Sequence, residues 1–162
     1  MSKTYDDFLT SVPEADIAFV KEMHEIFLNH ECKIDVKEAK SGFTVTYFYM
    51  LDKKRIALMN YVFRKQGMLV RIYARHIANY EKILDTLPEG MKKEVVKAGD
   101  CKRLNGISEC SPTCTAGYDF HMDGVNYKKC KNSAFFWRVC EENNSFIKEM
   151  IENDLRSKFE VQ

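Results

Sequence analysis

The chain has 162 residues, of which 45% are apolar and 30% charged, and its formal net charge is +1. This composition suits one globular domain that buries roughly 70% of its unfolded surface, and it excludes the disordered and coiled-coil classes. No apolar run approaches the roughly 20 residues that span a bilayer, and the first residues have no apolar signal segment. We therefore expect a cytoplasmic protein with no membrane partner.

The charge is unevenly distributed along the chain. Residues 52–103 carry thirteen Lys or Arg against six Asp or Glu, whereas both flanking segments are acidic. Two interpretations follow: the acidic ends lie against the basic middle and neutralise it, or the middle presents a basic face to an anionic partner.

The apolar pattern predicts a helix followed by a sheet. Ser11 and Glu14 have capping-box spacing, and a broad apolar stripe then runs to about His30. From Cys32 onwards the period changes to two, which predicts an antiparallel meander. Its three strands are expected at residues 43–51, 55–63 and 68–75.

The third predicted strand places Arg71, Tyr73 and Arg75 on one face, opposite the apolar residues of the same strand. If the register allows, Tyr61 and Phe63 of the neighbouring strand lie beside them. A sheet surface with guanidinium groups next to aromatic rings can hold phosphates and stack bases, so these three residues form a candidate surface for an anion or a nucleic acid. The same pattern also suits a solvated outer face with no partner.

Later elements complete the expected fold. Residues 77–87 predict a short helix, and a second helix is expected from Thr86 to Gly99. A hairpin follows at residues 118–127, then a strand in which Trp137 alternates with Phe136 and Arg138 on the opposite side. A last amphipathic helix is expected to begin at residues 143–145.

Cysteines cluster between residues 101 and 140, where five of the six lie. Cys110 and Cys114 flank a Ser-Pro-Thr turn, the predicted hairpin returns to Cys130, and Cys101 lies in the preceding loop. Stable disulfides are rare in a reducing compartment, so clustered cysteines there indicate metal ligation. Four thiolates can form the tetrahedral site that Zn²⁺ prefers. The candidate ligands of a structural zinc ion are therefore Cys101, Cys110, Cys114 and Cys130.

Several alternatives to this zinc site remain open from the sequence. His121 or Cys140 can replace Cys101 as the fourth ligand, and an iron–sulfur cluster uses the same thiolates. The cysteines can also be buried unligated thiols, disulfides, or reactive groups in a catalytic or redox role.

The segment from Cys110 to Cys130, with its Cys-x3-Cys step, Gly-Tyr-x-Phe and Gly-x2-Tyr-x2-Cys, is followed by Ala134-Phe135-Phe136. It resembles the C-terminal portion of uncharacterised small bacterial proteins over residues 101–140. The resemblance implies a bacterial origin and brings no assigned activity or catalytic residue.

The sequence thus predicts a single α+β domain over residues 1–162, with an antiparallel sheet, flanking helices and a cysteine-rich subregion at 101–140. The expected function is a non-enzymatic binding or regulatory module with a structural zinc site and a basic sheet surface. Its partner is an anionic macromolecule, with nucleic acid as one case, or another protein. The rival expectation is a small-molecule-binding or enzymatic domain whose aromatic residues line a pocket.

Overall fold

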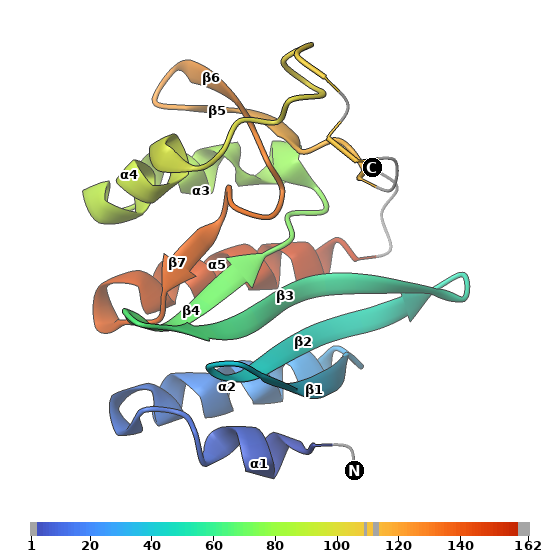
Figure 1. Ribbon diagram of the computed structural model, residues 1–162, viewed down its shortest axis with the longest axis vertical. Coiled ribbons are helices and arrows are strands. Elements are labelled where there is room, and N and C mark those ends of the chain that lie inside the picture. The colour runs from blue at the N-terminus through green and yellow to red at the C-terminus, as the bar shows by residue number, and fades with distance from the viewer. Residues whose placement is uncertain (1–2, 109, 112–113, 159–162) are drawn as a thin grey trace.

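A five-stranded antiparallel sheet in the order β1-β2-β3-β4-β7 organises the fold (Figure 1). The structure is a computed structural model that describes residues 3–108, 110–111 and 114–158. The strands are β1 (Lys33–Ala39), β2 (Gly42–Leu51), β3 (Lys54–Arg64), β4 (Gly67–Ile72) and β7 (Phe136–Arg138). The domain combines helices with antiparallel strands, which confirms the predicted α+β class.

The register of the strands divides the sheet into two faces. Val70 of β4 is paired with Tyr61 of β3 and Trp137 of β7, and all three are almost fully buried. The next row pairs Arg71 with Asn60 and Phe136. Because side chains alternate along each strand, these two rows point to opposite sides of the sheet. We call the side of Val70 the inner face and the side of Arg71 the outer face.

Helices cover the inner face of the sheet. In Figure 1, α5 (Glu141–Arg156) passes behind β4 and β7. Next to it, α2 (Ile17–Asn29) packs its apolar stripe on β2, where the ring of Phe27 stacks on Tyr47 with centroids 4.1 Å apart. The predicted core-facing helices are thereby confirmed.

The N-terminal region begins one helix earlier than the sequence suggested. Helix α1 (Tyr5–Leu9) starts from a capping box in which Thr4 and Asp7 bond each other's backbone N–H. The capping-box spacing at Ser11 and Glu14 instead precedes the short 3-10 turn η1 (Glu14–Asp16), and α2 follows it directly. The predicted helix is therefore correct in its body and wrong in its start.

A second group of elements lies along the β7 edge of the sheet (Figure 1). It consists of η2 (Ile77–Tyr80), α3 (Glu81–Thr86), α4 (Glu89–Lys97) and the hairpin of β5 (Tyr118–Met122) and β6 (Val125–Lys129). The hairpin turns at Asp123 and Gly124, both with positive φ, as an Asp-Gly turn favours. The Trp137 indole N–H donates to the Met91 carbonyl at 3.0 Å and so joins α4 to the sheet.

Three boundaries differ from the sequence-based expectations. Strand β1 was not predicted and adds a fifth strand to the sheet. Strand β4 ends at Ile72, so residues 73–75 continue outside it. Helix α5 begins at Glu141, with Cys140 as its N-cap, ahead of the expected start at 143–145. None of the helices among the described residues is long and apolar enough to cross a membrane.

Candidate functional site

The outer face of the sheet is the candidate functional site. In Figure 1, no helix of the described residues crosses in front of β4 and β7. The cationic side chains of this face, identified by alternation and register, are Lys33, Lys37, Arg55, Arg64, Arg71 and Arg138. Asp35 is the one carboxylate among the strand residues that point outward. The face is therefore basic, with aromatic rings between its charges.

Arg71 is held in the middle of this face by three contacts. Its Nε donates to the Asn132 carbonyl at 2.7 Å, and its Nη1 donates to Asn60 Oδ1 at 3.2 Å. The guanidinium carbon also lies 4.7 Å from the centre of the Phe136 ring. None of the ion pairs of the described residues involves Arg71. Its charge is thus fixed in position without a carboxylate to neutralise it.

A second guanidinium–aromatic pair lies towards the other edge of the face. The Arg55 guanidinium carbon is 3.9 Å from the centre of the Phe48 ring, and its Nη2 is 3.2 Å from Asp35 Oδ2. Lys37 also approaches the same carboxylate oxygen, at 3.6 Å. Because these groups are partly exposed, the ion pairs are weak and exchangeable with solvent or a ligand.

Of the three surface residues predicted from sequence, the structure brings two together. Tyr73 lies next to Asn60, whose amide nitrogen donates to the Tyr73 hydroxyl at 3.2 Å, and Asn60 in turn bonds Arg71. The expected neighbours Tyr61 and Phe63 do not join them. The register opposes Tyr61 to Val70 on the inner face, where it is fully buried.

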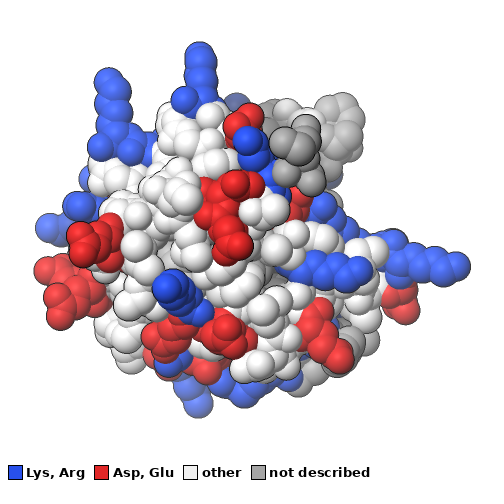
Figure 2. Space-filling model, turned by 90° about the horizontal axis from the view of Figure 1, so that it is seen from below, with Lys and Arg blue, Asp and Glu red and all other residues white. Residues whose placement is uncertain are grey.

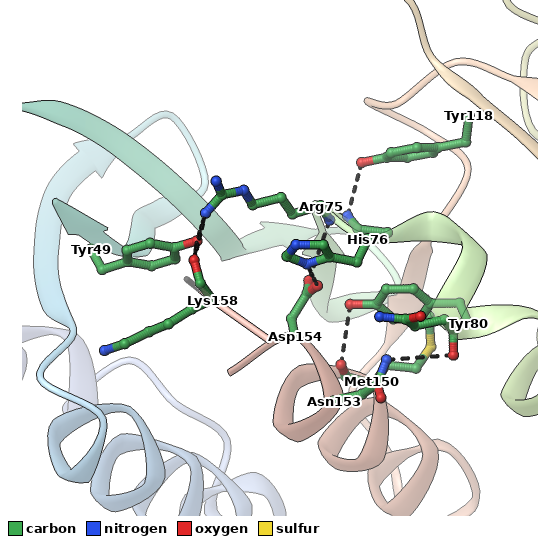
Figure 3. A network of polar contacts seen from close by, with 11 residues as sticks. Tyr49, Arg75, His76, Tyr80, Tyr118, Met150, Asn153, Asp154 and Lys158 are labelled. Atoms are coloured by element: carbon green, nitrogen blue, oxygen red, sulfur yellow. Dashed lines mark hydrogen bonds and ion pairs between the residues drawn. The ribbon is translucent and has the colours of Figure 1, made fainter. Parts of the chain in front are cut away.

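Arg75 is the predicted surface residue that the structure places elsewhere. Beyond the end of β4 its side chain turns towards the inner face and donates to the Lys158 carbonyl at 2.8 Å and to the Tyr49 hydroxyl (Figure 3). Tyr49 itself is 2% exposed. Arg75 therefore points away from the surface to which the sequence assigned it, and it ties Lys158 to β2.

Next to Arg75, a buried polar network joins α5 to the chain that follows β4 (Figure 3). Asp154 Oδ1 is 3.6 Å from His76 Nδ1, and the Arg75 backbone N–H donates to Asp154 Oδ2 at 3.4 Å. Burial raises the pKa of Asp154, although its contacts with Tyr80, Arg75 and His76 oppose the rise. Asp154 is 2% exposed, so the network is closed to solvent at this carboxyl group.

The cysteine-rich subregion contains one sulfur in a preorganised site. Cys101 Sγ accepts backbone N–H bonds from Leu104 at 3.5 Å and from Gly117 at 3.3 Å. Burial opposes the thiolate, but these two N–H groups and that of Arg103 outweigh it and lower the pKa of Cys101. Gly117 is required at this point, because a Cβ there would come within 2.1 Å of the Lys129 carbonyl oxygen. Such a ring of amides stabilises a thiolate.

Cys101 and Cys130 occupy diagonal positions of a short antiparallel pairing. Asp100 bridges Lys129, the Cys101 N–H donates to the Lys128 carbonyl at 2.9 Å, and the Cys130 N–H donates to the Gly99 carbonyl at 2.7 Å. Cys101 and Cys130 each flank the bridge, so alternation turns both side chains to the same face. The structure thus places these two predicted ligands on the same face of the pairing.

The other predicted ligands lie in the loop that follows Cys101. Cys114 is half-buried and Cys110 exposed. Two contacts join this loop to the residues next to Cys101 and Cys130. Lys131 bonds the Thr115 hydroxyl, and Arg103 donates to the Ser111 carbonyl at 3.2 Å. No three Cys, His, Asp or Glu side chains of the described residues already form a metal-binding group.

The two alternative fourth ligands occupy other places in the fold. His121 is exposed on β5, where its Nδ1 lies 3.5 Å from a carboxylate oxygen of Glu81. Cys140 caps α5 and lines a groove with Trp137 and Asn143. The six cysteines are free thiols. Cys32 lies outside the cysteine-rich subregion, and burial raises its pKa to about 11.

The aromatic residues expected to line a pocket mostly form the core. Tyr47, Tyr61, Phe120 and Trp137 are at most 1% exposed. One groove of about 310 Å³ does open between α4, β7 and the start of α5, with Phe136, Arg138 and Glu142 among its lining residues. It adjoins the outer face, and its volume lies at the lower end of the range of small-molecule sites.

The uneven charge of the sequence is partly neutralised in the fold. Arg55 and Lys92 of the basic middle segment pair with Asp35 and Asp123 of the acidic flanks. Figure 2 shows the side below the view of Figure 1, where Lys and Arg are interspersed with Asp and Glu. The outer face of the sheet keeps a basic excess that this side does not show.

Comparisons with known proteins add no family to this description: no family model, curated protein or solved structure matches the chain. The outward-facing Arg55 and Asn60 were not singled out from the sequence. Alternation in β2 and β3 was visible, but the register that places Asn60 beside Arg71 and Arg55 over Phe48 was not.

Proposed function

We propose that the protein is a non-enzymatic binding module that holds an anionic macromolecule on the outer face of its sheet. The observation that supports this most directly is the positive charge of this face, where six cationic side chains and one carboxylate of the strands point outward. A basic surface of this kind attracts polyanions and raises their rate of association. Arg71 is central to it because its position is fixed and its charge is unopposed.

The test is binding of fluorescein-labelled heparin, a flexible polyanion, followed by fluorescence anisotropy. We expect an affinity that falls at least tenfold between 50 and 200 mM salt, and a further loss of about tenfold for Arg71→Glu. The matched control is Lys21→Glu, the same change of charge on exposed α2 behind the sheet, which should bind like the unmodified protein. Binding that ignores salt, or that both variants weaken equally, would rule the proposal out.

Arg75→Glu separates surface charge from structure. Because Arg75 bonds Tyr49 and Lys158 inside the molecule, its reversal should lower thermal stability more than it lowers heparin affinity at a temperature where the variant is folded. Arg71→Glu should do the opposite.

We further propose that Cys101, Cys110, Cys114 and Cys130 hold a structural zinc ion that fixes the loop between Cys101 and β5. The amide-bonded sulfur of Cys101 and the position of Cys130 on the same face of the pairing support this assignment. Zinc binding would draw the two loop cysteines towards Cys101 and Cys130 and cross-link the segments that carry them.

Elemental analysis of protein purified without added metal or chelator tests the zinc site. We expect about one zinc per chain, its loss in Cys101→Ser, and a lower melting temperature after chelation. Cys140→Ser is the matched control: it should keep the metal and be at least as stable, since serine is a favoured N-cap. Metal-free protein with readily reacting thiols would contradict the assignment.

A further inference from the structure

The outer face combines cations with exposed aromatic rings, and this combination narrows the class of partner. We propose that its ligand is single-stranded nucleic acid, an inference that rests on the proposed function and specifies it. Phe48, Tyr73 and Phe136 are each partly exposed on this face. A surface that served only to attract charge would gain nothing from rings exposed to water.

The rings are spaced as a platform for successive bases. Phe136 lies on β7 next to Arg71, Tyr73 follows Arg71 by two residues, and Phe48 lies two strands away on β2. Strand spacing and rise place neighbouring rings roughly 8–10 Å apart. Stacking of unpaired bases on aromatic side chains in a basic surface is the common way to bind single strands, and it tolerates any sequence.

The guanidinium groups complement these rings. Arg71 lies over Phe136 and Arg55 lies over Phe48, so a guanidinium plane is stacked on one face of each ring. The two hydrogen bonds of Arg71 to described residues use two of its five N–H donors. The remaining donors and the exposed guanidinium plane are suited to phosphate oxygens and to stacking on a base.

The dimensions of the sheet favour a single strand over a duplex. Five strands separated by 4.7–4.9 Å give a face roughly 19 Å wide. The major groove of B-DNA is about 12 Å wide and admits a helix or a two-stranded ribbon. The face therefore cannot enter the groove, and in a duplex the bases stay stacked on each other and out of reach of Phe48, Tyr73 and Phe136.

The experiment compares three labelled oligonucleotides of equal length by fluorescence anisotropy at one salt concentration: a thymidine 12-mer, an abasic 12-mer with the same backbone charge, and a 12-base-pair duplex. We expect the full-length protein to bind the thymidine strand at least tenfold more tightly than the abasic strand, and more tightly than the duplex. Phe136→Leu keeps an apolar side chain and should weaken thymidine binding about fivefold or more while leaving abasic binding unchanged.

Phe146→Leu is the matched control, because Phe146 is a partly buried phenylalanine on α5, on the other side of the sheet. Phe48→Leu is a second test variant if Phe136→Leu does not fold. Equal affinity for the thymidine and abasic strands, or preference for the duplex, overturns the inference while the polyanion surface stands. Failure to bind heparin or any oligonucleotide overturns the proposed function as well.

Discussion

The two faces of one sheet carry opposite chemistry, and adjacent residues of β7 show it most clearly. Trp137 points to the inner face and is 1% exposed, whereas Phe136 and Arg138 on either side of it point outward. The inner face is closed by helices and holds aromatic and aliphatic side chains. The outer face holds cations and partly exposed rings, with Val62 and Leu69 buried among them. Because side chains alternate along a strand, those on one face form the core, and those on the other face remain available for a partner.

This division has an energetic basis. Side chains of the inner face such as Tyr47, Tyr61 and Val70 lose all contact with water, which contributes about 1.5–3 kcal/mol for each large apolar group. The outer rings are only partly covered, and their cation–aromatic contacts contribute about 0.5–1 kcal/mol each at exposed sites. Stability should therefore depend on the inner face, and substitutions on the outer face should be tolerated.

The largest expected effect is on the inner face. Trp137→Ala removes a buried indole and its hydrogen bond to Met91, so we expect the free energy of unfolding to fall by about 3–5 kcal/mol. Phe136→Ala, one residue away, should cost about 1 kcal/mol. Denaturant unfolding followed by circular dichroism measures both. Similar losses for the two variants would mean that the outer face is covered in solution and that the contrast between the faces is wrong.

The next effect concerns the carboxyl group of Asp154, which is buried at the edge of the inner face. Burial raises the pKa of Asp154, so the folded protein retains this proton to a higher pH than the unfolded chain does. The contribution of Asp154 to stability is then complete below its ordinary pKa of 3.8 and is lost as the pH rises through the raised value. Asp154→Asn lacks this titration.

We therefore expect the stability of the unmodified protein, relative to Asp154→Asn, to decline from pH 4 to pH 7. His76, Tyr80 and the Arg75 amide face Asp154 in both proteins, so the difference isolates the carboxyl group. Unfolding free energies at several pH values provide the measurement. A difference that grows in favour of aspartate as the pH rises would show that the ion pair with His76 outweighs the cost of burial.

Local patterns in the sequence were sufficient for most of the fold. Period-two alternation located β2, β3 and β4, the Asp-Gly pair located the turn at Asp123 and Gly124, and the alternation around Trp137 assigned Phe136 and Arg138 to the opposite side. Strand β1 was not predicted because its residues are mostly charged. As an edge strand it needs few apolar side chains, and its lysines discourage pairing with other chains.

The candidate site was less predictable than the fold because it depends on contacts between distant segments. Arg71 and Tyr73 lie on the side of the sheet where alternation placed them, Tyr73 through its contact with Asn60. Arg75 points elsewhere because, three residues past the end of β4 at Ile72, its side chain bonds Tyr49 and Lys158. The partners of Arg71 come from β3, β7 and the turn before β7, and no local pattern specifies that register.

A smaller effect distinguishes two buried tyrosines of the inner face. The Tyr47 hydroxyl lies 2.8 Å from His24 Nδ1, whereas the Tyr61 hydroxyl is buried and has no hydrogen-bond partner among the described residues. We expect Tyr47→Phe to cost about 1 kcal/mol and Tyr61→Phe to be neutral or stabilising by up to about 1 kcal/mol. Thermal unfolding of the two variants, which delete the same atom, compares them. A clear loss for Tyr61→Phe would indicate that its hydroxyl is hydrogen-bonded in solution.

The smallest effect on stability should accompany a gain in binding. Asp35 makes only exposed ion pairs with Lys37 and Arg55, so Asp35→Asn should change the free energy of unfolding by less than about 1 kcal/mol. The same change removes the only carboxylate among the outward-pointing strand residues and frees two cations, and we expect heparin affinity at low salt to rise about threefold. Anisotropy titrations at 50 and 200 mM salt measure the gain, which should shrink at the higher concentration because salt screens exposed charges. Unchanged affinity at both salt concentrations would show that the β1 side of the outer face lies outside the binding surface, and would confine that surface to the neighbourhood of Arg71 and Phe136.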